Sequence, residues 1–166
     1  MQRERSFAQK DDTKRRGRAT LPDFFTAEAA RGLIRYRMVS LPVGNVLIVE
    51  DDRDTREMLA ALLATEGFHA VAAEDGLEAL HLLRTVRHRA PEAPCLVLLD
   101  LRMPRLGGGE FRRAQLGDPT VASVPVAVMS GAADVEQRAQ ALGAVATVTK
   151  PIDIDILLDV VRRYCA

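Results

Sequence analysis

Two runs of consecutive apolar residues stand out along the chain, and each ends in acidic residues. The run 46–49 leads directly into three acids at 50–52, and the run 95–99 leads into Asp100. A strand that is covered on both faces needs an unbroken apolar run, whereas a strand with one face in water alternates apolar and polar residues. The two runs therefore predict central strands of a parallel sheet with helices on both sides.

Further strands and helices alternate along the rest of the chain. Short apolar segments predict strands over 68–73, 125–130 and 145–149. Apolar residues at helical spacing predict a helix after each strand, with Asp52 as the cap of the first and Met58, Leu77 and Ile156 on apolar faces. Five strands and five helices joined by right-handed crossovers predict a doubly wound α/β domain with a five-stranded parallel sheet.

The charges are unevenly distributed along the chain. All 166 residues together carry no net charge, and 48% of them are apolar, which is typical of one soluble globular domain. Residues 1–43, however, hold ten basic and five acidic side chains. This asymmetry predicts a basic, disordered extension over 1–43 and a folded domain over 44–166. Translation from Met38 would remove most of the extension, and a basic arm that touches nucleic acid or a membrane is the less favoured alternative.

The two cysteines and the hydropathy bear on location. Cys95 and Cys165 lack the spacing of metal ligands, so we expect free thiols in a reducing compartment. No apolar stretch approaches the length needed to cross a membrane, and the N-terminus lacks the apolar core of a secretory signal. We therefore expect a cytoplasmic protein without a membrane partner.

Polar side chains follow the predicted strands at the point where four of them end. The carboxyl ends of parallel strands meet at one edge of a sheet, so these side chains are expected together there. Clustered carboxylates repel one another unless a cation neutralises them, and their hard oxygen ligands suit Mg²⁺, which pairs with phosphate. A lysine and a serine hydroxyl can contact phosphoryl oxygens. The sequence thus predicts a phosphoryl site on or near Asp100, with the residues Glu50, Asp51, Asp52, Ser130 and Lys150 around it.

Four segments resemble the receiver domain of bacterial response regulators: VLIVEDD at 46–52, LLDLRMP at 98–104, VMSG at 128–131 and TKP at 149–151. The resemblance covers about residues 45–164. It implies the flavodoxin-like receiver fold, with Asp100 as the nucleophile that takes a phosphoryl group from a sensor histidine kinase or a histidine phosphotransfer protein. It implies a phosphoacceptor signalling domain rather than an enzyme, although such a domain assists its own phosphorylation and dephosphorylation.

The resemblance also implies a metal site. Asp51 and Asp100 would bind Mg²⁺ directly, Glu50 would act through water, and the backbone carbonyl of Arg102 would complete the protein ligands.

Three further positions acquire roles from the resemblance. Lys150 would stabilise charge on the transferring phosphoryl group, and its bond to Pro151 is expected to be cis. Ser130 would hydrogen-bond the phosphoryl group once it is formed. Thr147 stands where the family often has an aromatic residue that changes rotamer on activation, so coupling through such a residue is not expected here.

The chain ends after the last predicted helix, which suggests a stand-alone receiver that signals through contacts with a downstream protein. A phosphorylation-independent pseudo-receiver is one alternative, and the complete set of site residues argues against it. A phosphatase of the haloacid dehalogenase type also uses a strand-end aspartate. That family needs a second aspartate two residues later, where this chain has Arg102. Nucleic acid is not an expected partner.

Overall fold

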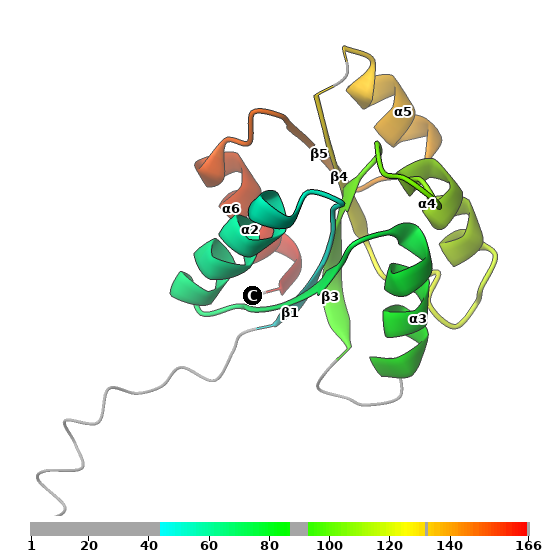
Figure 1. The fold of residues 1–166 in the computed structure, drawn as a ribbon, viewed down its shortest axis with the longest axis horizontal. Helices are drawn as coiled ribbons and strands as arrows, with labels where there is room; N and C mark the ends of the chain where they lie inside the picture. The colour runs from blue at the N-terminus through cyan, green and yellow to red at the C-terminus, as the bar shows by residue number, and fades with distance from the viewer. Residues whose placement is uncertain (1–43, 87–92, 132, 166) are drawn as a thin grey trace, which may run out of the picture. The chain divides into compact units, whose positions relative to one another are not determined.

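Ten helices and strands alternate in the computed structural model, which describes residues 44–86, 93–131 and 133–165. The predicted extension over 1–43 lies outside the described residues. All strands pair in parallel, in the order β2-β1-β3-β4-β5, which confirms the doubly wound five-stranded sheet (Figure 1). The elements are β1 Asn45–Val49, α2 Arg53–Thr65, β2 His69–Ala73, α3 Gly76–Val86, β3 Pro94–Asp100, α4 Gly108–Leu116, β4 Val126–Ser130, α5 Val135–Ala141, β5 Ala146–Thr149 and α6 Ile154–Cys165.

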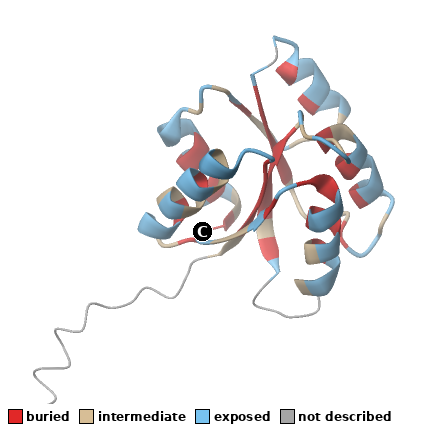
Figure 2. Cartoon of the chain, in the orientation of Figure 1, coloured by how far each residue is buried: buried red, intermediate tan, exposed pale blue. Residues whose placement is uncertain are grey.

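Helices cover both faces of the sheet. Helices α2 and α6 lie on one face, and α3, α4 and α5 lie on the other (Figure 1). Successive strand residues point to opposite faces, so Val46 and Ile48 belong to the core beneath α2 and α6, while Leu47 and Val49 belong to the other core. Figure 2 shows the resulting band of buried residues along the central strands. The unbroken apolar runs are therefore explained by burial on two sides.

Aspartate side chains cap the N-termini of α2 and α3. The Asp52 carboxylate accepts a hydrogen bond from the Thr55 amide at 2.8 Å, as the sequence predicted for α2. The Asp75 carboxylate likewise accepts from the amides of Leu77 and Glu78, both at 2.9 Å. These contacts satisfy amides that have no partner within the helix.

Three residues that were expected on apolar helix faces are exposed. The exposed fraction is 47% for Met58, 58% for Leu77 and 50% for Ile156, so the prediction was wrong for them. Each helix buries only a narrow stripe of residues against the sheet. In α2 this stripe includes Leu59, the residue after Met58, and in α6 it includes Leu157, the residue after Ile156. Consecutive residues on a helix differ by about 100° in direction, so a neighbour of a buried residue can face solvent.

The prediction of two free thiols was also wrong. Cys95, near the start of β3, and Cys165, at the end of α6, form a disulfide with their Cα atoms 5.3 Å apart. The two cysteines are 70 positions apart in the sequence, which gave no sign that the start of β3 and the end of α6 lie side by side. Among the described helices, none is long and apolar enough to cross a membrane.

Candidate functional site

The strand ends bring Glu50, Asp100 and Lys150 to the same face of the sheet. In each case the residue two places earlier belongs to the core beneath α2 and α6, so the alternation of the strand directs all three side chains to that face. The Lys150 Nζ atom lies 2.6 Å from Glu50 Oε2 and 2.8 Å from Asp100 Oδ2. One ammonium group therefore bridges two carboxylates from β3 and the end of β1.

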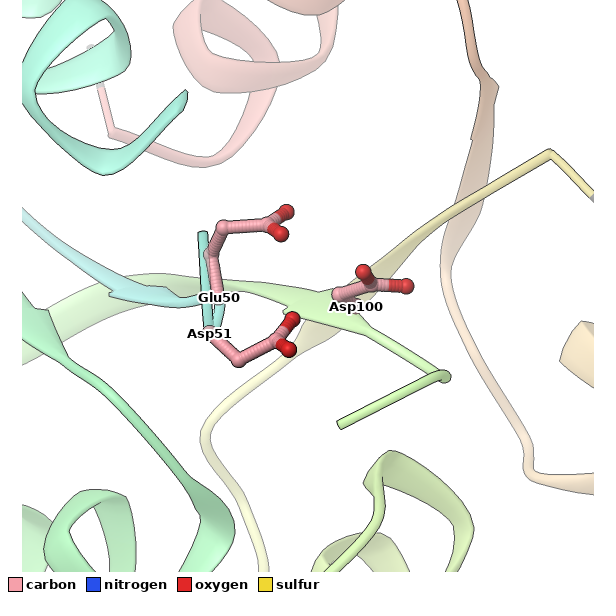
Figure 3. Close-up of side chains that lie close together, drawn as sticks. All are labelled: Glu50, Asp51 and Asp100. Atoms are coloured by element: carbon pink, nitrogen blue, oxygen red, sulfur yellow. The ribbon is translucent and has the colours of Figure 1, made fainter. Parts of the chain in front are cut away.

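Three carboxylates form the centre of the site. Oxygen atoms of Glu50, Asp51 and Asp100 lie within 4.8 Å of one another. Figure 3 shows the two acids that follow β1 beside Asp100 at the end of β3. Glu50 is 1% and Asp100 6% exposed, whereas Asp51 is exposed to solvent. The site is thus anchored in the domain and open on the side of Asp51.

Charge compensation links Lys150 to the buried acids. Burial raises the pKa of Glu50, and the neighbouring Asp100 raises it further, against the lowering effect of the Lys150 hydrogen bond. Burial alone would lower the pKa of Lys150, but its hydrogen bonds to Asp100 and Glu50 outweigh burial and raise this pKa. Lys150 therefore stays charged and supplies the positive charge that the two buried acids need.

Arg56 also holds the acidic residues in place, and sequence reasoning missed it. Its guanidinium group donates hydrogen bonds to the backbone carbonyls of Glu50 at 2.6 Å and Asp51 at 2.8 Å. The contact ties the first turns of α2 to the end of β1. Because the acceptors are backbone atoms, which every residue carries, no residue pattern could have indicated this pairing.

The remaining predicted residues also lie at this edge of the sheet. The Arg102 amide donates to Asp100 Oδ1 at 3.1 Å, which orients the carboxylate. Ser130 is buried at the end of β4, and its carbonyl accepts a hydrogen bond from the Lys150 amide at 3.0 Å. The Lys150–Pro151 peptide bond is cis, as the resemblance implied. Thr147 is half-buried on β5.

The loop after Asp100 is fastened to the start of α3 by Arg105. This residue has a positive φ of 64°, which is uncommon for a residue other than glycine. Its guanidinium forms ion pairs with Glu74 and, at 2.6 Å, with Asp75, whose side chain is only 3% exposed. The Gly76 amide also donates to the Leu106 carbonyl at 3.2 Å. Sequence reasoning missed this connection.

Replacing Arg105 with glycine is expected to lower the free energy of unfolding, because buried Asp75 loses its counter-charge. Glycine accepts the positive φ without strain but also changes the entropy of the unfolded chain, so the ion-pair contribution is taken from the coupling between two variants. Urea denaturation of R105G, D75N and the double variant measures the coupling. In D75N the buried charged partner is already gone and only the exposed pair with Glu74 remains, so R105G should then have a smaller effect. Fully additive effects would contradict the proposed ion-pair contribution.

The described residues form a parallel α/β domain with a buried aspartate at the end of its third strand, two acids after its first and a lysine after its fifth, an arrangement consistent with a phosphoacceptor site. A family model for the response regulator receiver domain matches residues 46–162. The chain belongs to this family of two-component signalling proteins.

Relatives of known name agree with this assignment. Sporulation initiation phosphotransferase F of Bacillus subtilis is 33% identical over 120 residues, which are 72% of this chain and 91% of that protein. The polar-differentiation response regulator DivK of Brucella anthropi is 29% identical and covers 72% of this chain and 94% of its own. The regulatory protein AtoC of Escherichia coli is 35% identical over 73% of this chain, which spans only 25% of AtoC.

Solved structures show the same fold. A response regulator receiver protein from Pseudomonas putida has a TM-score of 0.62 and 32% identity, covering 72% of this chain and 96% of its own. The chemotaxis response regulator CheY4 of Vibrio cholerae has a TM-score of 0.64 and 27% identity, covering 73% and 98%. The observed strand order is thus that of receiver domains.

Proposed function

We propose that Asp100 accepts a phosphoryl group from a phosphohistidine, carried by a sensor histidine kinase or a histidine phosphotransfer protein. The observation that carries this proposal is the position of the Asp100 carboxylate, buried at the end of β3 between the Lys150 ammonium and the acids that follow β1. An anionic nucleophile can approach an anionic phosphoryl group only where positive charge is supplied. Lys150 supplies one positive charge, and the three carboxylates can bind a cation that supplies another.

The donor set fits Mg²⁺. Three carboxylates lie close together and one of them faces solvent, which suits an ion that keeps several of its waters. Glu50, Asp51, Asp100 and the backbone carbonyl of Arg102 would hold it. When bound, the ion would neutralise charge on the transferring phosphoryl group.

The protein's own groups prepare the transfer. The Arg102 amide and the Lys150 ammonium each hold one oxygen of Asp100, so the carboxylate is oriented before the donor arrives. An Asp100 oxygen attacks phosphorus, the bond from phosphorus to the donor imidazole nitrogen breaks, and an acyl phosphate forms. Lys150 Nζ lies 2.8 Å from Asp100 Oδ2 and would contact an oxygen of a phosphoryl group on this carboxylate. Ser130, at the adjacent strand end, would hydrogen-bond the product.

Output would occur through contacts with a downstream protein, from a single-domain regulator in the cytoplasm with a basic extension over 1–43. The proposal of a single domain is supported by two relatives, because the matching region covers 91% of phosphotransferase F and 94% of DivK. The match to AtoC covers only 25% of that protein, so a region similar to this chain also forms part of a longer regulator.

Incubation with acetyl phosphate and measurement of the intact mass tests the proposal. We expect one phosphoryl adduct that requires Mg²⁺ and is lost in D100N. The matched control is D159N, because Asp159 lies on α6 with its side chain 82% exposed and should leave the adduct unchanged. A folded chain that binds Mg²⁺ and forms no adduct would instead be a phosphorylation-independent interaction module.

A further inference from the structure

A pair of sulfur atoms lies at the opposite end of β3 from the phosphoacceptor. Cys95 is half-buried near the start of this strand, and Cys165, the last residue of α6, is 6% exposed. Asp100 lies five positions further along this extended strand than Cys95, a distance of about 16 Å. The disulfide therefore has no direct contact with the phosphoryl chemistry and needs a separate explanation.

We propose that Cys95 and Cys165 form a reversible thiol–disulfide site that fastens the end of α6 to the sheet. The couple would exchange with a low-molecular-weight disulfide such as oxidised glutathione. Oxidation closes a covalent link between β3 and α6, and reduction opens it. This inference rests on the cytoplasmic location in the proposed function, because disulfides in reducing compartments are usually exchangeable, whereas permanent ones are found in oxidising compartments.

The surroundings of the two sulfurs suit both states. A Cβ atom at Gly44 would lie 2.9 Å from Cys95 Sγ and 2.9 Å from the Cys165 carbonyl, so glycine is needed for the chain to pass this close. The Asn45 carbonyl oxygen lies 3.0 Å from Cys95 Sγ. In the reduced protein this oxygen can accept a hydrogen bond from the thiol, so the opened site has a polar partner ready.

The reduced domain should remain folded, which a reversible site requires. The sheet is covered on both faces by fully buried apolar residues, and a core of this size does not depend on a disulfide. Helix α6 is also held by Leu157 and Val161 in the core and by an ion pair between Arg162 and Glu66 at 2.7 Å. Opening the disulfide therefore removes the covalent anchor of the last turn of α6, while the Arg162 ion pair and the core contacts still hold the helix on the sheet.

The exchange balances in two steps. The thiolate of Cys95, the more exposed of the two residues, attacks one sulfur of the oxidant and expels the first thiolate. Cys165 then attacks the Cys95 sulfur of this mixed disulfide, forms the internal bond and expels the second thiolate. The two cysteine protons pass to the two released thiolates, and the oxidant gains two electrons.

The redox state of the two cysteines would affect α6, the helix that begins shortly after Lys150. Its first turn follows the phosphoacceptor site, and its last turn carries Cys165. The exposed residues Ile154 and Ile156 lie on this same helix. The redox state would thus set how firmly the C-terminal end of this helix is held, while its N-terminal end follows Lys150 of the acidic site.

Titration of the full chain with mixtures of reduced and oxidised glutathione tests the site. Each sample is quenched with a maleimide, and the intact mass counts the labelled thiols. We expect two labels under reducing conditions, none under oxidising conditions, and a joint loss of both between them. Two labels at every ratio would overturn the proposal, and so would none at every ratio, which would indicate a permanent cross-link. D100N should give the same titration, because the site is independent of phosphorylation.

Two further measurements address the mechanism and the effect. C165S leaves only Cys95, which should accumulate a mixed disulfide with glutathione, and an unmodified folded C165S would contradict attack by Cys95. Hydrogen exchange of the wild-type chain should show faster deuterium uptake in the last turn of α6 after reduction, with unchanged uptake in β1. Equal uptake in both redox states would overturn the fastening role, whether or not C165S folds.

Discussion

Replacing Lys150 with methionine is expected to lower the free energy of unfolding of the Mg²⁺-free domain by about 3 kcal/mol. The reason is that Glu50 and Asp100 remain buried beside each other after their shared ammonium group is removed. We expect the low end of the range for a broken buried ion pair, because the Lys150 side chain is 26% exposed. Methionine keeps most of the length and apolar volume of lysine, so packing is largely preserved.

The effect of K150M should depend on both pH and Mg²⁺. Burial already raises the pKa of Glu50 above its ordinary 4.5, and loss of the lysine raises it further. The native variant then binds a proton at a pH where the unfolded chain has released it, so stability falls as the pH rises through the raised pKa. The deficit relative to wild type should therefore be small below about pH 4.5 and full near neutral pH. Mg²⁺ should restore part of it, because the ion replaces the missing charge.

Urea denaturation at several pH values, with and without Mg²⁺, measures these effects. R162M is the control, because it breaks an exposed ion pair with Glu66 and should cost less than about 1 kcal/mol at any pH. A deficit in K150M that is independent of pH and Mg²⁺ would mean that lost packing, and not lost charge, is responsible. In the acetyl phosphate reaction K150M should form little adduct, since the proposed stabilisation of the phosphoryl group is gone.

The second large effect is expected at Gly108, the first residue of α4. A Cβ atom there would lie 2.3 Å from the Asp100 carbonyl oxygen and 2.8 Å from the Leu101 Cα atom. Both are backbone atoms that cannot rotate away, so G108A must shift the chain directly after the phosphoacceptor. We expect a loss of about 3 kcal/mol of stability and reduced formation of the phosphoryl adduct.

Gly109 provides a matched control for this prediction. A Cβ atom at Gly109 would meet only the Arg113 Nη1 atom, at 3.8 Å, so G109A has room and should be neutral or slightly stabilising in the helix. Thermal denaturation of the two variants in parallel measures the difference. Similar melting temperatures for G108A and G109A would show that the loop after Asp100 adjusts freely.

The sequence predicted the position of a residue best where that position is determined by the strand to which the residue belongs or which it follows. Glu50, Asp100 and Lys150 each follow an apolar strand, and parallel pairing alone is enough to bring them to one edge. This local information predicted the fold class and the members of the acidic site. The hydrophobic pattern did not give the order of the strands in the sheet, because the pattern of one strand does not depend on which strands pair with it.

Contacts between distant segments escaped prediction for different reasons. Arg56 binds backbone carbonyls, so its acceptors have no residue type to recognise. Arg105 pairs with acids about thirty residues earlier, and many arginines and acids lie at such separations. The cysteines gave the opposite result to the one expected, since their pairing depends on where the end of α6 comes to rest on the sheet.

In the disulfide-bonded chain, residues 95–165 form a covalent ring. Some residues of the acidic site lie inside this ring and others lie outside it. Asp100, Ser130 and Lys150 lie within the ring, whereas Glu50 and Asp51 belong to the linear segment that precedes it. A backbone cut within the ring would leave the protein in one covalent piece. A cut between α3 and β3 would end the covalent link of Glu50 and Asp51 to Asp100, so that only non-covalent contacts, among them the pairing of β1 with β3 and the Lys150 bridge, still held the three acids together.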